Sequence, residues 1–234
     1  RHAFEANRGA TLRHLICNVS GSLKPGEAPG EVFNYQTTGM CLLTHCIERA
    51  YGLYDIDDPA GSVKIGRLFK EKIADRIGAG WEYSAGSQKM AEGARVDIFG
   101  WGTSIRTTLG DHARMGWLWC NHGMWQGEQI IPGDWLRQSV CVNRFVREQG
   151  EQVLWRYGHG FWSNESGQLW PDLPADGFTS WGAGGNYAIC FPSLSLTIAM
   201  NPVNFAGQTQ PYETMSDAWR FQQQVLSPIL DSIH

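Results

Sequence analysis

The sequence has no strong excess of one charge and no long apolar run. Its 19 lysines and arginines stand against 23 aspartates and glutamates, a net charge of −4 with a pI of about 6.0. Proteins that bind nucleic acid or anionic membranes usually carry a basic patch, so we expect neither partner. No apolar run approaches the roughly 18 residues of a membrane-spanning helix, and residues 1–8 lack the apolar core of a signal peptide. We therefore expect no membrane span.

The sequence also lacks recognisable metal and cofactor motifs. No Cys-x-x-Cys or His-Glu-x-x-His spacing occurs among its six cysteines and seven histidines, so no metal is expected. Buried free thiols are the favoured interpretation of the cysteines, while their even number leaves disulfides open. The glycines of Gly100-Trp101-Gly102 lack the rest of a dinucleotide-binding fingerprint, so no cofactor is expected. The cysteines are Cys17, Cys41, Cys46, Cys120, Cys141 and Cys190.

Glycine and tryptophan are abundant in a composition that is otherwise ordinary. The 234 residues are 42% hydrophobic and 18% charged, which predicts a folded chain of one large or two small domains. The 28 glycines and 11 tryptophans indicate tight turns around large aromatic surfaces. Concave binding sites use such surfaces, and so do tryptophan-rich cores.

Apolar residues at three- and four-residue intervals predict five helices in the first two thirds of the chain and one near its end. Thr11 is a candidate N-cap for the first helix, and Thr108 with Asp111 has the spacing of a capping box. Pro132 stands where a first helical residue is favoured, and Pro228 is expected to end or kink the last helix. The predicted helices cover residues 11–19, 37–51, 62–77, 108–120, 132–139 and 215–226.

Short aromatic and β-branched runs replace this pattern after about Val153. Residues 155–164, 185–191 and 194–200 are expected to be strands, and Pro192-Ser193 is expected to be the turn of a hairpin. A helix-rich middle followed by antiparallel strands and a closing helix predicts an α+β fold.

Several sequence blocks, in order along almost the whole chain, resemble the serine β-lactamase and penicillin-binding-protein superfamily. The most specific block runs from Pro29-Gly30 through Phe33-Asn34-Tyr35 to a helix that contains Leu42-Leu43, and it is similar to the second motif of that family. The match is to the branch that includes class C β-lactamases, esterases, D-amino-acid peptidases and amide hydrolases. The other blocks are residues 11–21, 111–116, 121–132, 157–162 and 181–186.

The resemblance implies that Tyr35 shares a proton with the nucleophile. A phenol has a pKa of about 10, so this role needs cationic neighbours that lower the pKa or a proton relay through a lysine. A tyrosine that merely anchors a loop is the alternative. Thr37 stands where many relatives have an asparagine that binds the substrate, which weakens a β-lactamase assignment more than an esterase assignment.

The run Trp181-Gly182-Ala183 stands where relatives have Lys-Thr-Gly or His-x-Gly. A tryptophan cannot bind a substrate carboxylate as a cation would, so the resemblance implies a neutral or hydrophobic substrate. The small residues Ala183, Gly184 and Gly185 would let a backbone N–H form part of an oxyanion hole. Trp101, Trp162 and Trp181 would line an aromatic pocket at the active-site cleft, unless they are core residues.

The family's nucleophile motif is missing. Catalysis in this family needs a serine with a lysine three residues later, and the residues three positions before the lysines are glycine, arginine or phenylalanine. Three explanations remain open: a fragment or processed chain whose other piece carries the nucleophile, a truncated relative without catalysis, or another serine. The candidate serines are Ser84, Ser87 and Ser104.

We therefore expect a β-lactamase-like α+β fold that lacks the N-terminal strands, in a chain that is inactive alone. The expected reaction is hydrolysis of a small ester or amide through an acyl-serine, and a catalytically inactive binding or scaffold protein is the alternative. Missing strands would expose a sheet edge, so the isolated chain should be oligomeric or bound to the missing segment or another chain. The expected parts are an N-terminal helix and loop (residues 1–34), a helical subdomain (35–152) and a region of sheet and closing helix (153–234).

Overall fold

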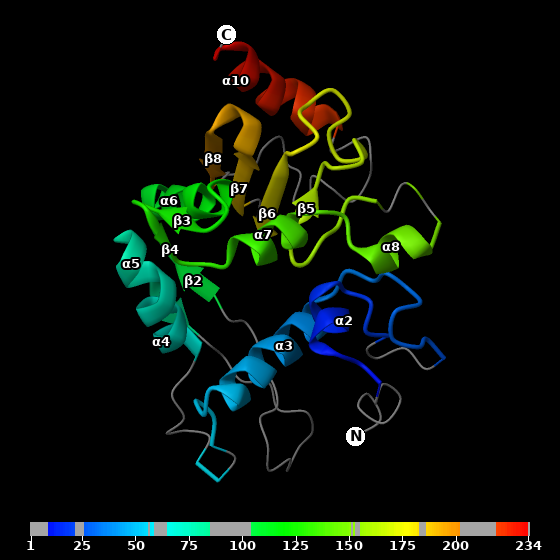
Figure 1. Ribbon diagram of the computed structural model, residues 1–234, viewed down its shortest axis with the longest axis vertical. Coiled ribbons are helices and arrows are strands. Elements are labelled where there is room, and N and C mark those ends of the chain that lie inside the picture. Colours follow the sequence, from blue (N-terminus) through cyan, green and yellow to red (C-terminus); the bar gives the residue numbers. More distant parts are fainter. Residues whose placement is uncertain are drawn as a thin grey trace. The chain divides into compact units, whose positions relative to one another are not determined.

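A computed structural model describes residues 9–21, 26–55, 57–58, 65–84, 104–150, 152, 155–182, 186–201 and 219–233 (Figure 1). These residues belong to two units, Arg1–Asp111 and His112–His234. The expected division into three parts stays a prediction.

The first unit begins with two short helices whose starts follow from their caps. Helix α2, Leu12–Ile16, begins after Thr11, whose hydroxyl accepts a hydrogen bond from the His14 N–H at 3.2 Å while the His14 ring accepts one from the Thr11 N–H. Helix α3, Thr37–Ala50, is capped by the Gln36 side chain, which accepts a hydrogen bond from the Gly39 N–H at 2.9 Å. Both predicted helices are confirmed, although α2 is shorter than expected.

Another helical segment and a small hairpin complete the first unit. The helical segment contains α4, Ile65–Phe69, a π-helical turn, Lys70–Ala74, and α5, Asp75–Ile77. It ends where predicted, at Gly78, whose φ of +67° is a left-handed conformation that glycine adopts without strain. Strands β1, Glu82–Ser84, and β2, Ser104–Arg106, form an antiparallel pair.

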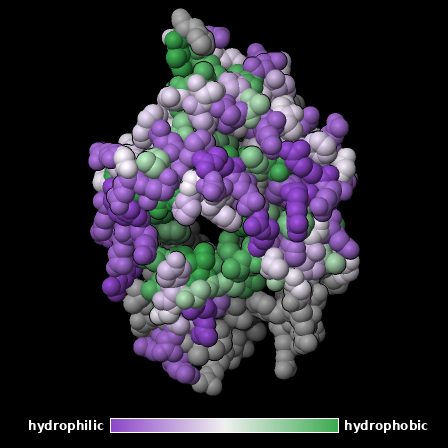
Figure 2. Space-filling model, in the orientation of Figure 1, coloured by the Kyte–Doolittle hydropathy of each residue, from purple (hydrophilic) through white to green (hydrophobic). Residues whose placement is uncertain are grey.

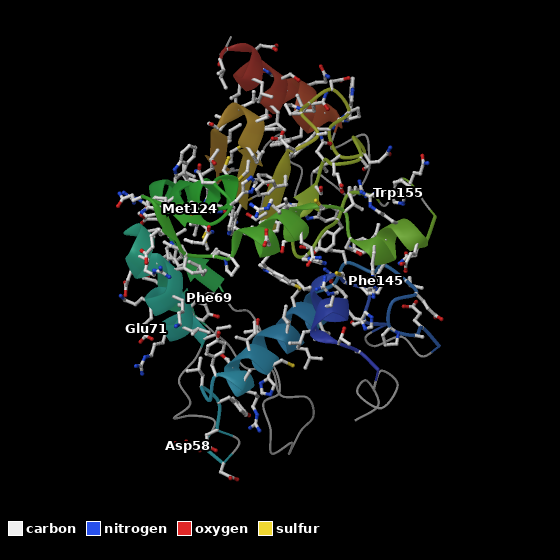
Figure 3. All side chains as sticks on the ribbon, viewed as in Figure 1. Asp58, Phe69, Glu71, Met124, Phe145 and Trp155 are labelled. Carbon is white, nitrogen blue, oxygen red and sulfur yellow. The ribbon has the colours of Figure 1, made fainter. Side chains whose placement is uncertain are left out.

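The helical segment of residues 65–77 is amphipathic. Phe69 packs toward Tyr83 of β1, with ring centroids 6.3 Å apart, and Glu71 pairs with Arg67 on the exposed face. Figure 3 shows Phe69 and Glu71 on opposite sides of this segment, and its outer surface in Figure 2 is largely hydrophilic.

The second unit is built around a four-stranded antiparallel sheet in the order β5-β6-β7-β8. The strands are β5, Trp162–Ser163, β6, Phe178–Gly182, β7, Asn186–Phe191, and β8, Leu196–Met200, and a 3-10 turn at Pro192–Leu194 joins the last two. The hairpin at Pro192 is therefore confirmed. Of the strand expected over residues 155–164, only β5 forms, because residues 155–161 are turns and an isolated bridge.

Helices cover both faces of this sheet. Helix α6, Leu109–Cys120, packs on the face that carries Ala188 and Thr197. The C-terminal helix, which has a π-helical turn at Gln222–Leu226 followed by α10, Ser227–Asp231, packs on the opposite face through Phe221, 5.4 Å from the Tyr187 ring. Strand β7 is buried on both faces from Tyr187 to Phe191, which explains its continuous apolar sequence.

Smaller elements connect α6 to the sheet. A hairpin of β3, Met124–Trp125, and β4, Glu128–Gln129, is followed by α7, Gly133–Val140, and α8, Arg144–Glu148. The helix predicted after Pro132 is confirmed, but Pro132 is its N-cap and not its first residue. The α+β prediction is confirmed.

Gly116 sets the closest approach between α6 and the sheet. A Cβ atom at Gly116 would lie 2.5 Å from Thr197 Cγ2 and 3.3 Å from Ala188 Cβ. We expect Gly116→Ala to lower the free energy of unfolding by about 1–3 kcal/mol through overpacking, measured by urea denaturation.

The matched control is Gly110→Ala in the same helix, where the nearest atom would be 3.9 Å from the new Cβ. That change should raise stability by about 0.5–1 kcal/mol. Thr197→Ser removes the clashing methyl group and should recover part of the loss in the double variant. Equal losses at Gly116 and Gly110 would contradict this packing.

Candidate active site

Tyr35 stands at the entrance to α3, the place that the sequence predicts for the candidate proton-transfer residue. The residue is 51% exposed, so part of Tyr35 is accessible from solvent. Partial burial of the ring raises the pKa of Tyr35 above its ordinary value. One of the two expected routes of proton transfer, in which cationic neighbours lower the pKa, is therefore not supported. The phenol is neutral at physiological pH.

Asn18 holds the chain on both sides of Tyr35. Its backbone carbonyl accepts a hydrogen bond from the Asn34 N–H at 2.8 Å, and its side-chain Oδ1 accepts one from the Gln36 N–H at 3.2 Å. Asn18 is buried and has a φ of +56°, a left-handed conformation that asparagine tolerates better than most residues. Asn18 therefore fixes the backbone that carries Tyr35.

No motif in the sequence marks Asn18 as a site residue. The available signal was an asparagine just after α2, a residue type that favours left-handed turns. Only the folded chain shows that a residue 18 positions away from Gln36 binds its N–H.

Asn18 contributes to stability in two ways, as a hydrogen-bond acceptor and as a residue that tolerates a left-handed backbone. Substitutions should separate these two contributions. Asn18→Gly keeps the left-handed backbone but removes Oδ1, so the Gln36 N–H loses its acceptor at a cost of about 1–2 kcal/mol. Asn18→Ala loses the same acceptor and also strains the backbone, so we expect it to be less stable than Asn18→Gly by about 1 kcal/mol. Thermal denaturation measures the difference, and hydrogen exchange of the Gln36 amide should accelerate in both variants. An alanine variant as stable as the glycine variant would contradict the assignment.

A row of aromatic rings occupies one face of the sheet in the second unit. Trp181 of β6 lies opposite Tyr187 of β7, and the Trp162 and Trp181 ring centroids are 5.5 Å apart. Trp162 is buried, with Tyr157 packed edge-on at 5.2 Å. Trp181 is half-buried. Trp162 is thus part of the core, and Trp181 is the more accessible of the two.

A cation lies against this aromatic row. The guanidinium carbon of Arg156 lies 5.6 Å from the centroid of the Trp162 ring, an arrangement typical of a cation–π interaction. Burial lowers the pKa of Arg156, which still leaves a guanidinium charged at neutral pH. This region therefore carries a positive charge even though residue 181 is not a cation. The sequence alone does not place Arg156 in this region.

Other candidate residues are placed only in part. Thr37 is the first residue of α3, and Gly182 is the exposed last residue of β6. Ser84 and Ser104 lie opposite each other in the β1–β2 register. Trp101, Ala183, Gly184, Gly185 and Ser87 lie outside the described residues.

Within the described ranges, no group of three or more histidine, cysteine or acidic side chains could hold a metal ion. No helix in the same part of the chain is both long and apolar enough to cross a bilayer. All six cysteines are described, and each is a free thiol.

Comparison with known proteins identifies the fold. No protein-family model and no curated protein matches the sequence. A crystal structure of a candidate β-lactamase from Bacteroides dorei is similar to the chain, with a TM-score of 0.59, 19% identity, and coverage of 90% of this chain and 71% of that one. A β-lactamase from Mycobacterium bovis gives a TM-score of 0.61 at 17% identity and coverage of 94% and 74%. A candidate 6-aminohexanoate-dimer hydrolase from Bacillus anthracis gives 0.58 at 19% identity and coverage of 89% and 47%.

The chain has a β-lactamase-like fold, as the sequence blocks predict. The identities are too low to carry an activity across, so the comparison establishes the fold alone.

Proposed function

We propose that the chain belongs to a β-lactamase-related serine hydrolase that cleaves a small ester or amide through an acyl-serine. The observation that carries the proposal is Tyr35, half exposed at the start of α3 with Asn18 bound to the backbone on both sides. The β-lactamase-like fold supports it, since the similar solved structures are named as β-lactamases and an amide-dimer hydrolase.

In this proposal Tyr35 transfers protons as a neutral phenol. A serine hydroxyl attacks the substrate carbonyl, its proton passes to a base, and the leaving group departs with a proton that Tyr35 donates or relays. Water then hydrolyses the acyl-serine. A raised pKa suits a group that must hold its proton until the leaving group needs it.

The end of β6 and the residues after it would bind the reacting carbonyl. Backbone N–H groups of Ala183, Gly184 and Gly185 are proposed to contact the developing oxyanion, where one well-placed donor is worth about 10²–10³-fold in rate. Gly182, Thr37, Trp101 and Trp181 are proposed to bind the substrate, whereas the buried Trp162 ring packs against Trp181 as part of the core. The half-buried Trp181 ring favours a neutral acyl or aryl group at this position.

The serine itself is proposed to lie outside these 234 residues, because no Ser-x-x-Lys pair occurs within them. The same observation favours a second candidate function. A protein with this fold and no nucleophile could bind a ligand or partner without catalysis.

Turnover of nitrophenyl esters of short acids distinguishes the two functions. We expect no turnover by this chain alone and measurable turnover when the segment that precedes Arg1 in its reading frame is included in the expressed protein. Saturable binding of the ester without turnover in both proteins would support the binding function and contradict the hydrolase.

A further inference from the structure

Two thiols from distant parts of the sequence lie together in the core of the second unit. Cys120 is the last residue of α6, and Cys190 is in the central strand β7. They pack with Phe178 in one buried cluster, in which Cys120 is 5% and Cys190 0% exposed. Neither thiol has a role in the proposed hydrolysis.

Each sulfur donates a hydrogen bond to a backbone carbonyl close to the other thiol. Cys190 Sγ donates a hydrogen bond to the Gly116 carbonyl at 3.2 Å, one helical turn before Cys120. Cys120 Sγ donates to the Leu196 carbonyl at 3.5 Å, and Leu196 is the β8 partner of Phe191, the residue that follows Cys190. Both thiols belong to the same buried cluster. A disulfide between these two thiols would therefore join α6 to β7 inside this cluster.

The two sulfurs differ in acidity. The hydrogen bond from Cys190 lowers the pKa of the Cys120 thiol, while burial raises the pKa of Cys190 well above its ordinary value. A thiolate is the form that attacks an oxidant, and Cys120 is also the more accessible thiol, at 5% exposed against 0% for Cys190. We therefore expect Cys120 to react first and Cys190 to resolve the product.

We propose that Cys120 and Cys190 form an oxidation site that a peroxide converts to a disulfide between α6 and β7. The Cys120 sulfur attacks one oxygen of hydrogen peroxide, the O–O bond breaks, and a sulfenic acid and one water form. The Cys190 sulfur then attacks the sulfenic sulfur, the S–O bond breaks, and a second water leaves with the Cys190 proton. Two thiols and one peroxide become one disulfide and two waters, so the peroxide is the oxidant and the thiols are the reductant.

The remaining cysteines provide the controls. Cys141 is exposed and its thiol donates to the Arg137 carbonyl at 3.2 Å, so it would react with peroxide separately. Cys141→Ser keeps a hydrogen-bond donor at this position and removes that reaction. The Cys141→Ser chain is therefore the background for the test, and its five thiols are the original six minus one.

The test treats the folded Cys141→Ser chain with hydrogen peroxide, counts free thiols after denaturation, and maps peptides by mass spectrometry. We expect the thiol count to fall from five to three, with one cross-linked peptide pair that contains Cys120 and Cys190, and dithiothreitol should restore all five. A further Cys190→Ser change should leave Cys120 as a sulfenic acid that dimedone traps, whereas Cys120→Ser should leave Cys190 reduced.

Five thiols after treatment, or a cross-link that joins any other cysteines, would overturn the proposal. If Cys190→Ser or Cys120→Ser fails to fold, the peptide map of the Cys141→Ser chain still shows whether Cys120 and Cys190 are cross-linked. The outcome does not depend on hydrolase activity, since the test needs only the folded chain.

Discussion

Asn164→Asp is expected to destabilise the second unit by about 3–5 kcal/mol, the largest loss of stability we predict for one substitution. Asn164 is 0% exposed. Its amide nitrogen donates to three carbonyl groups, those of Trp170 at 2.9 Å, Leu173 at 3.2 Å and Pro174 at 3.0 Å. Its oxygen accepts a hydrogen bond from the Trp170 N–H at 2.7 Å. An isosteric carboxylate would place a negative oxygen against the three carbonyl oxygens.

The pH dependence of this loss follows from the same contacts. Burial and the facing carbonyls should raise the folded-state pKa of the introduced carboxyl above its unfolded value. The variant should therefore be least stable relative to the parent above that raised pKa, and the difference should shrink as the pH falls and the carboxyl takes up a proton.

Urea denaturation of the two proteins at several pH values measures the effect. Asn121→Asp is the matched control, because Asn121 is partly exposed and its amide donates only one described hydrogen bond, to the Trp117 carbonyl at 2.8 Å. It should cost about 1 kcal/mol. Similar losses at Asn164 and Asn121 would show that the buried hydrogen bonds do not organise the loop before β6.

Tyr35→Phe should lower the rate of ester hydrolysis by about 10²-fold or more in the protein that turns over nitrophenyl esters. The change removes only the hydroxyl, and the backbone around it stays bound to Asn18. Because the pKa of Tyr35 is raised, its phenol stays protonated below pH 10, so the parent rate should show no inflection from Tyr35 between pH 6 and pH 9. A rise of the rate with pH in that range that is lost in Tyr35→Phe would indicate a phenolate.

Tyr51→Phe provides the control, since Tyr51 is also exposed but follows the end of α3. Its substitution should leave the rate within about threefold. A loss below about threefold for Tyr35→Phe as well would make Tyr35 a structural tyrosine.

Local rules explain the elements that the sequence predicts well. Thr11 and Gly78 each act through neighbours within a few residues, by side-chain capping and by a left-handed backbone. The Thr108 hydroxyl likewise accepts a hydrogen bond from the Asp111 N–H at 3.1 Å. These contacts do not include the reciprocal bond of a capping box. Instead, the Asp111 carboxylate accepts a hydrogen bond from the Thr108 hydroxyl at 2.9 Å and another from the N–H of Gly80, which is distant in sequence, at 3.3 Å.

Elements that depend on distant partners were predicted less well. Strand β6 was expected only through the family resemblance at residues 181–186, because its short sequence from Phe178 has no clear alternation and is stabilised by pairing with β5 and β7. In the C-terminal helix, Trp219 is 54% exposed, and Phe221 is the aromatic residue that packs against the Tyr187 ring of the sheet.

Pro228 does not end that helix. The π-helical turn before it, Gln222–Leu226, shifts the hydrogen-bond pattern, and α10 continues to Asp231. A proline has no N–H to donate, so it is tolerated at the start of the new helical segment.

The candidate site shows the same division between local and distant causes. Tyr35 could be found because its motif is contiguous in sequence. Asn18 and Arg156 could not be found in this way, because their partners, the Gln36 N–H and the Trp162 ring, come close to them only in the folded chain.

Labelling with a fluorophosphonate tests the acyl-serine proposal most directly. The expressed protein includes the segment that precedes Arg1 in the reading frame, and mass spectrometry locates the label. We predict one labelled serine, in that segment, with a lysine three residues later. A label on Ser84, Ser87 or Ser104, or ester turnover with no labelled serine, would contradict the account.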